Sequence, residues 1–239
     1  MSKESSAPGL HAGDGFRTGF PILVGYFPIA IAFGLLAKSA TLTFGGSLSF
    51  SVFVFAGASQ FMALNLLKTG VAIGEIIIAT LLLNFRHLLM SASLAARLEG
   101  RNRRFLPLVA FGVTDETFAV AATQEGGLTI PYLLALEVTA YSGWVSGTAV
   151  GYLIGGILPP LVQASLGIGL YAMFVALLIP QCKKARSIAA LALGAGLINA
   201  LLGMANLLSG GWNLVAAMLI AACLGAAFRK EDEMEEERA

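Results

Sequence analysis

Apolar runs long enough to cross a bilayer follow one another along nearly the whole chain. A transmembrane helix needs about 20 apolar residues, whereas a transmembrane β-strand needs about 10 and alternates in polarity. The runs here are long and do not alternate, so we expect an all-α polytopic membrane protein with about six to eight helical segments. The candidate segments are residues 20–37, 47–67, 71–95, 105–122, 132–157, 162–182, 186–208 and 212–228.

Composition agrees with a membrane protein. Hydrophobic residues make up 57% of the 239 residues and charged residues only 12%, against about 25% charged residues in an ordinary soluble domain. The net charge of +1 offers no excess of one sign for binding nucleic acid. We therefore expect a multi-pass protein of the cytoplasmic (inner) membrane.

Polar sequence flanks the apolar region at both ends. We expect a polar N-terminal segment at 1–18, a single membrane domain at 19–228, and a charged C-terminal tail at 229–239 that is solvated and disordered.

The distribution of lysine and arginine conflicts with eight full crossings. Basic residues gather at 97–104, at 183–186 and at 229–230, and such loops normally stay in the cytoplasm. Eight crossings would place the first two loops on opposite sides. The conflict disappears if one segment within 20–95 and another within 105–182 enter the membrane without crossing it, which predicts discontinuous or re-entrant helices.

Weak internal similarity points the same way. FVFAGASQF (53–61) resembles FVALLIPQC (174–182), and LLLNFRHLLM (81–90) can be aligned with AGLINALLGM (195–204). Two related halves with interrupted helices are typical of secondary transporters. The alternative is that the many glycines only let helices pack closely.

The run NFRH (84–87) places polar groups inside an apolar segment. A charge at the bilayer centre costs about 2.5–3.5 kcal/mol on insertion scales, so Arg86 needs a partner or water. On a helix, Asn84 and His87 share a face while Arg86 points well away from Asn84. The natural partners of Arg86 are Asp115 and Glu116. Arg86 is then either a structural ion pair between helices or a clamp for a substrate carboxylate.

Other polar residues inside apolar segments are weaker candidates. Gln60, Gln181 and Asn199 are candidate substrate-binding residues, with Gln60 following small residues that let a backbone approach a ligand. Glu75 and Glu137 lie close to the ends of their segments, so we expect both carboxylates to be solvated at the membrane interface.

Three stretches resemble the AzlC family of branched-chain amino acid permeases: FAGASQFMALNLL (55–67), LLLNFRHLLMSASLA (81–95) and VTDETFAV (113–120). The resemblance covers roughly residues 15–228. It implies an exporter of valine, leucine and isoleucine, with methionine as a further candidate, that works with a small membrane subunit of the AzlD family. The residues that match the family's recurrent polar motifs are Gln60, Asn84, Arg86, His87, Asp115 and Glu116.

An amino acid is a zwitterion with an apolar side chain, and the sequence offers groups for each part. We expect Arg86, or the backbone amides near Gly57, to bind the carboxylate. Asp115 or Glu116 would take the ammonium group or a coupled proton, and His87 would relay protons. One carboxylate would neutralise Arg86 and leave the other free to bind and release a proton.

Motifs of an enzyme or of a nucleotide-driven pump are missing from the sequence. It contains no HExxH, no GxSxG and no Gly-Lys phosphate loop, so we expect no enzymatic activity, no cofactor and no metal, and transport driven by a gradient. The alternative function is a channel-like or structural subunit whose polar groups bind a partner.

Overall fold

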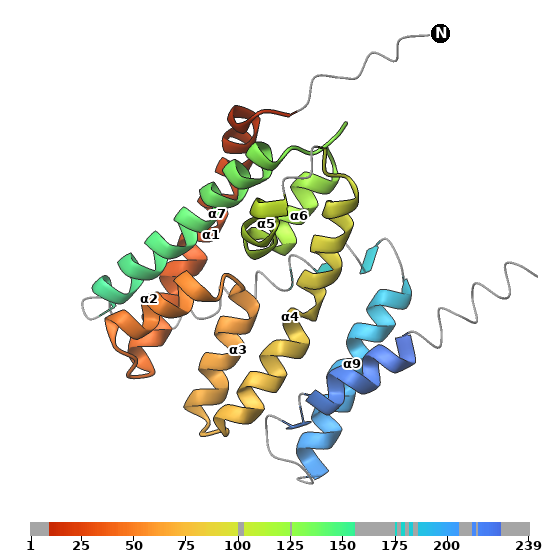
Figure 1. Cartoon of the computed structure of the whole chain (residues 1–239). Coiled ribbons are helices and arrows are strands. Elements are labelled where there is room, and N and C mark those ends of the chain that lie inside the picture. Colours follow the sequence, from red (N-terminus) through yellow and green to blue (C-terminus); the bar gives the residue numbers. More distant parts are fainter. Residues whose placement is uncertain are drawn as a thin grey trace, which may run out of the picture. The chain divides into compact units, whose positions relative to one another are not determined.

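The computed structural model describes residues 10–99, 103–124, 126–155 and 186–205, with short stretches at 175, 178–179, 182–183, 212–213 and 215–225. The regular elements of these residues are helices (Figure 1). They are α1 (Ala12–Ser39), α2 (Phe44–Phe53), α3 (Gly57–Lys68), α4 (Ile73–Ala96), the 3-10 turn η1 (Arg103–Phe105), α5 (Leu106–Gly112), α6 (Asp115–Ala122), α7 (Ile130–Ile154) and α9 (Arg186–Ala205). The predicted all-α membrane class is confirmed. Within the described ranges, three helices are long and apolar enough to span a bilayer: Ala12–Ser39, Ile73–Ala96 and Ser187–Ala205.

The chain forms two compact units. The first comprises residues 1–64 and 83–170, and the second comprises residues 65–82 and 171–239. The first unit contains α1, α2 and α5 to α7, together with the parts of α3 and α4 that carry the polar motifs. The second contains α9 and the apolar helix Val215–Gly225, in which Gly225 packs close to Leu191.

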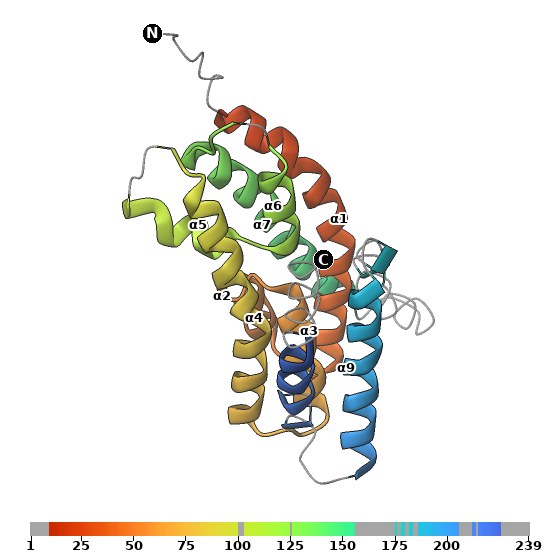
Figure 2. The same cartoon turned by 90° about the vertical axis from the view of Figure 1, so that its right-hand side faces the viewer.

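Helices α1 and α7 lie side by side and run parallel (Figure 2). Gly143, Gly147 and Gly151 of α7 recur every four residues and lie directly against the α1 backbone. The α1 residues that they face are also four apart: Leu23, Phe27 and Ile31. Small residues at this spacing let two helices approach backbone to backbone. For these glycines, close packing is therefore what the structure shows.

Helices α2 and α3 form a hairpin instead of one crossing. Phe50 of α2 and Phe61 of α3 both pack on Phe33 of α1, with ring centroids 6.3 and 5.4 Å apart. Phe55, in the break between the two helices, packs on Tyr26, 6.1 Å away. Tyr26 comes seven residues before Phe33, so it lies about 10 Å nearer the start of α1. After α1 ends, α2 therefore runs back toward Tyr26, and α3 returns in the opposite direction (Figure 1).

Helices α5 and α6 form a second hairpin, which opens at the other end of the unit. Arg97, just after α4, donates hydrogen bonds to the carbonyls of Ala122 (2.7 Å) and Gln124 (2.6 Å), at and beyond the end of α6. Arg86, eleven residues earlier on α4, pairs with Asp115 at the start of α6. Helix α6 therefore runs beside α4 toward the end of α4. Helix α5 starts shortly after α4 ends, so it runs the opposite way.

The arms of these hairpins are too short to cross a bilayer. They contain 7 to 12 residues, which makes them about 10–18 Å long, against a hydrocarbon core of about 30 Å. Helix α1, with 28 residues, is about 42 Å long. The discontinuous helices expected within 20–95 and 105–182 are therefore present, since the apolar runs 47–67 and 105–122 each contain two short helices. That neither hairpin crosses the membrane stays a prediction.

Basic residues gather at one end of the first unit. The start of α1, the end of α4 and the start of α7 meet there: Thr129 Oγ1 donates to Leu10 O (2.5 Å), and Leu128 N donates to Arg97 O (3.2 Å). Arg17 and Arg97 thus lie at the same end, which agrees with a cytoplasmic location. The loop at 183–186 lies largely outside the described residues, so its placement on the same side stays a prediction.

Two expected boundaries differ from the structure or stay open. Helix α1 begins at Ala12, inside the segment 1–18 that we expected to be polar and separate, because His11 and Asp14 form a reciprocal cap at its start. The single membrane domain at 19–228 remains a prediction. The tail at 229–239 lies outside the described residues.

Candidate functional site

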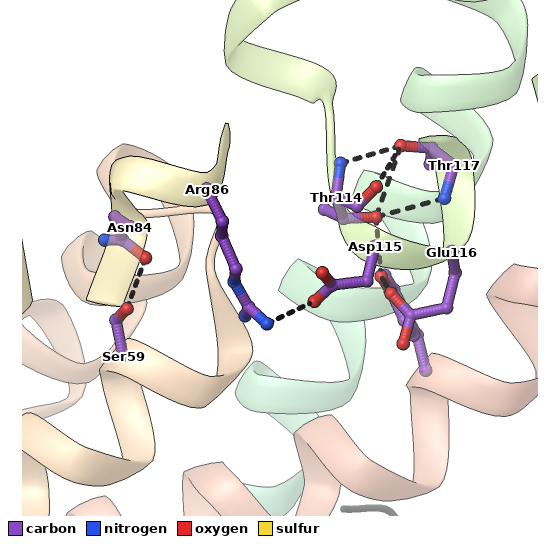
Figure 3. A network of polar contacts seen from close by, with 8 residues as sticks. Ser59, Asn84, Arg86, Thr114, Asp115, Glu116 and Thr117 are labelled. Carbon is purple, nitrogen blue, oxygen red and sulfur yellow. Dashed lines mark hydrogen bonds and ion pairs between the residues drawn. The ribbon is translucent and has the colours of Figure 1, made fainter. Parts of the chain in front are cut away.

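Arg86 and Asp115 form an ion pair at the break between α5 and α6. Arg86 Nη1 lies 3.0 Å from Asp115 Oδ2, and the two side chains are 38% and 33% exposed. Asp115 is the first residue of α6, where free backbone N–H groups favour a negative charge. The predicted pairing of Arg86 with the acidic pair is confirmed, and Figure 3 shows the contact.

The break before α6 is capped by threonines. Thr114 N donates to Thr117 Oγ1 (2.8 Å), and Thr117 N donates to Thr114 Oγ1 (3.3 Å), so each side chain satisfies the other's backbone (Figure 3). The hydroxyl of Tyr26 lies 2.8 Å from Thr114 Oγ1 and hydrogen-bonds the carboxylate of Glu116. These contacts connect α1 to the second break, and they engage Glu116 separately from Asp115.

Gln60 closes the break between α2 and α3. Its side chain is completely buried. Its Nε2 donates to Phe50 O (2.8 Å) and to Val54 O, and its Oε1 accepts from Trp144 Nε1 (3.0 Å). The carbonyls at the end of α2 need hydrogen-bond donors because the helix stops there. Both polar atoms of the Gln60 side chain are therefore engaged within the protein, and a direct role in substrate binding stays a prediction.

Asn84 and Arg86 point to different neighbours, as the helical spacing predicts. Asn84 Oδ1 accepts a hydrogen bond from Ser59 of α3, while Arg86 reaches α6 (Figure 3). His87 is half-buried, and no hydrogen bond engages its ring within the described part of the chain. Asn84 thus holds α4 against α3, and Arg86 holds α4 against α6.

Both breaks border one aromatic cluster. The ring of Tyr26 lies 6.1 Å from that of Phe55 and 5.4 Å from that of Trp144. The ring of Tyr141 lies 5.2 Å from that of Phe55 and 6.1 Å from that of Phe111, at the end of α5. Tyr26 and Tyr141 therefore each contact both hairpins, and the two breaks meet in the middle of the first unit.

Comparison with known proteins identifies the family. The chain matches the family model described as AzlC protein over residues 21–158. The chain belongs to the AzlC family. It is 37% identical to an uncharacterized membrane protein of Archaeoglobus fulgidus, over 75% of this chain and 82% of the relative. It is 32% identical to the inner membrane protein YgaZ of Escherichia coli, over 80% of each chain.

A more distant relative has a name that states a function. The chain is 26% identical to the branched-chain amino acid transport protein AzlC of Bacillus subtilis, over 85% of this chain and 81% of the relative. No solved structure matches the chain significantly. This AzlC family member is thus a membrane protein of a family linked to branched-chain amino acid transport.

Two predicted substrate-binding residues lie away from this network. Asn199 is on α9, in the second compact unit, and its side chain is exposed. Gln181 lies outside the described residues. Their roles in this AzlC protein stay predictions, and the polar network above is built without them.

Glu137 is the residue that sequence reasoning misjudged. We expected a solvated interfacial carboxylate, but only 3% of Glu137 is exposed. Helix α7 starts at Ile130 and packs along α1, which places Glu137 two turns inside a buried helix. A single carboxylate within LLALEVTA (133–140) was the available signal, because an ionisable residue in an apolar run is by default a functional candidate.

Proposed function

We propose that this protein is a gradient-driven secondary transporter that exports branched-chain amino acids across the cytoplasmic membrane together with a small AzlD-type membrane subunit. The observation that carries the proposal is the Arg86–Asp115 ion pair at the break of a half-depth hairpin. Discontinuous helices that meet near mid-membrane are where secondary transporters bind substrate. Membership of the AzlC family supports this assignment.

The ion pair suits a zwitterionic substrate. A guanidinium carries five N–H donors, and the pair uses Nη1, while the buried Nε of Arg86 has no hydrogen-bond partner among the described residues. The substrate carboxylate would replace Asp115 on Arg86, and the freed Asp115 would take the ammonium group. The number of opposite-charge pairs does not fall in this exchange, so the amino acid adds no net charge to the low-dielectric interior.

The neighbouring groups fit secondary roles in the same site. His87 is the next residue on α4 after Arg86, and its ring would relay protons between an entering substrate and water. Glu116 is bonded to Tyr26, so it holds the hairpin against α1 in this conformation. The backbone amides at the start of α3, near Gly57, remain a second candidate position for the carboxylate.

Efflux from liposomes tests the proposal. The purified protein, with and without the AzlD-type subunit, is placed in vesicles loaded with labelled valine. We expect saturable efflux that leucine and isoleucine inhibit competitively. Flux that rises linearly with concentration would favour the alternative, a channel-like subunit. Flux absent under every gradient and with the partner present would favour a structural subunit.

Arg86→Gln tests the substrate role. Loss of charged hydrogen bonds worth about 1.5–3 kcal/mol should weaken valine transport about 10- to 150-fold. The matched control is Arg17→Gln, since Arg17 is an exposed arginine near the start of α1. Insertion is checked by the yield of folded protein. Equal transport by wild type and Arg86→Gln would exclude Arg86 from the site.

A further inference from the structure

One carboxyl oxygen of Glu137 is buried and unpartnered among the residues that the structure describes. Glu137 is 3% exposed, and its Oε2 has no hydrogen-bond partner among the described residues. The carboxyl faces the end of α5. A Cβ added at Gly112, the last residue of α5, would lie 2.5 Å from Oε2 and 2.6 Å from Cδ of Glu137. The bare backbone of Gly112 therefore covers the carboxyl directly.

Among the residues that the structure describes, no cation pairs with this carboxyl. Other ionisable groups of the first unit have partners of their own: Arg86 on α4 pairs with Asp115 on α6, the Tyr26 hydroxyl on α1 bonds Glu116, and the Tyr141 hydroxyl on α7 donates to a carbonyl of α2. Since an unpaired carboxylate is very costly to bury, burial favours the neutral, protonated form of this group.

The cover over Glu137 belongs to the hairpin that also holds the ion pair. Gly112 ends α5, and two residues separate it from Asp115, the partner of Arg86. A shift of this hairpin away from α7 would uncover Glu137 and separate Asp115 from Arg86 in one movement. A carbon atom added to Gly112 would already lie 2.5 Å from Oε2, so the contact leaves no room for an ammonium group between them.

We propose that Glu137 is the proton-carrying carboxyl of the transport cycle, sealed by the end of α5 and exposed when the α5–α6 hairpin moves. This proposal rests on the proposed transport function. The carboxylate takes one proton from water on one side of the membrane to form an O–H bond, and it releases that proton to water on the other side. In this arrangement Asp115 is available to bind the substrate, and Glu116 keeps its hydrogen bond with Tyr26.

Infrared spectroscopy tests the protonation without any substrate. The purified wild-type protein at neutral pH should show the carbonyl stretch of a protonated carboxylic acid, and Glu137→Gln should lack it. The matched control is Glu99→Gln, because Glu99 is an exposed glutamate just beyond α4 and its replacement should leave the band. A band that Glu137→Gln leaves intact, or a wild-type protein without the band, overturns the proposal.

A conservative variant covers the case in which Glu137→Gln does not insert. Glu137→Asp keeps the carboxyl but withdraws it from Gly112, so the frequency of the band should shift. An unshifted band would mean that it comes from another residue, and the proposal would fail.

Transport measurements test the coupling. In vesicles, a pH gradient should no longer accelerate valine flux through Glu137→Gln. A pH-sensitive dye should report no proton movement with the valine. Exchange of valine for leucine should persist. Glu99→Gln should respond to the gradient as the wild type does. A gradient response of Glu137→Gln equal to that of wild type overturns the proposal. If the wild type moves no branched-chain amino acid, the proposed function fails, and the infrared result still decides the protonation of Glu137.

Discussion

Replacement of Gln60 by leucine removes the side chain that closes the break between α2 and α3. Leucine has nearly the same volume but no polar atom. The carbonyls of Phe50 and Val54 each lose one donor but keep a backbone donor, from Val54 N (3.0 Å) and Ala56 N (2.8 Å). The indole N–H of Trp144 loses the acceptor that it has in the structure. The substitution therefore leaves one buried donor unsatisfied and weakens two carbonyls.

The expected loss follows from these three hydrogen bonds. Side-chain hydrogen bonds within membrane proteins contribute about 0.6 kcal/mol on average and up to about 1.7 kcal/mol. Three of them give about 2–5 kcal/mol, which lowers the folding equilibrium constant about 30-fold to several thousand-fold. The unsatisfied indole of Trp144, which is 2% exposed, places the expectation in the upper part of this range.

Unfolding by sodium dodecyl sulfate in mixed micelles, followed by circular dichroism, measures this loss. The matched control is Asn65→Leu, because Asn65 is an exposed amide on the same helix and its replacement should change the free energy of unfolding by less than about 0.5 kcal/mol. If Gln60→Leu unfolds no more easily than Asn65→Leu, Gln60 does not hold the break, and the argument is refuted.

Two further predictions concern helix packing and topology. Gly151→Ala should destabilise the protein by about 1–3 kcal/mol although alanine favours helices, since its Cβ would lie 2.7 Å from backbone atoms of Ile31. The control Gly25→Ala, at an open position on α1, should not destabilise it. Equal free energies of unfolding of the two variants would contradict the close packing. In a cysteine-free background, a cysteine at Gly13 should react with an impermeant thiol reagent from the cytoplasmic side and one at Gly45 from the outside, because Gly13 lies at the start of α1 and Gly45 lies shortly after its end. Labelling from the same side would contradict the proposed crossing.

Much of the architecture could be predicted from the sequence. The length of the apolar runs indicates helices, and the distribution of basic residues requires segments that do not cross. The Arg86–Asp115 pair could also be predicted, because a charge inside an apolar helix needs a partner and an acidic pair lay within another segment. Hydropathy alone did not reveal the breaks at Val54 and Val113, since apolar residues continue through both of them.

The roles of two polar residues could not be predicted from the sequence. Gln60 lies among small residues near a helix break, a pattern that fits a ligand site as well as a structural plug, and only the positions of Trp144 and the α2 carbonyls distinguish the two. The burial of Glu137 depends on how α5 ends against α7, a contact between segments far apart in the chain.

The sequence by itself determined that this protein lies in a lipid bilayer, that it is helical and that Arg86 needs a partner. Each of these follows from the cost of placing polar groups in hydrocarbon, which depends on local composition. The tertiary structure decided which polar atoms are already satisfied and which remain available. Glu137 and Gln60 differ in this respect because hydrogen bonds and burial depend on the neighbours that packing supplies.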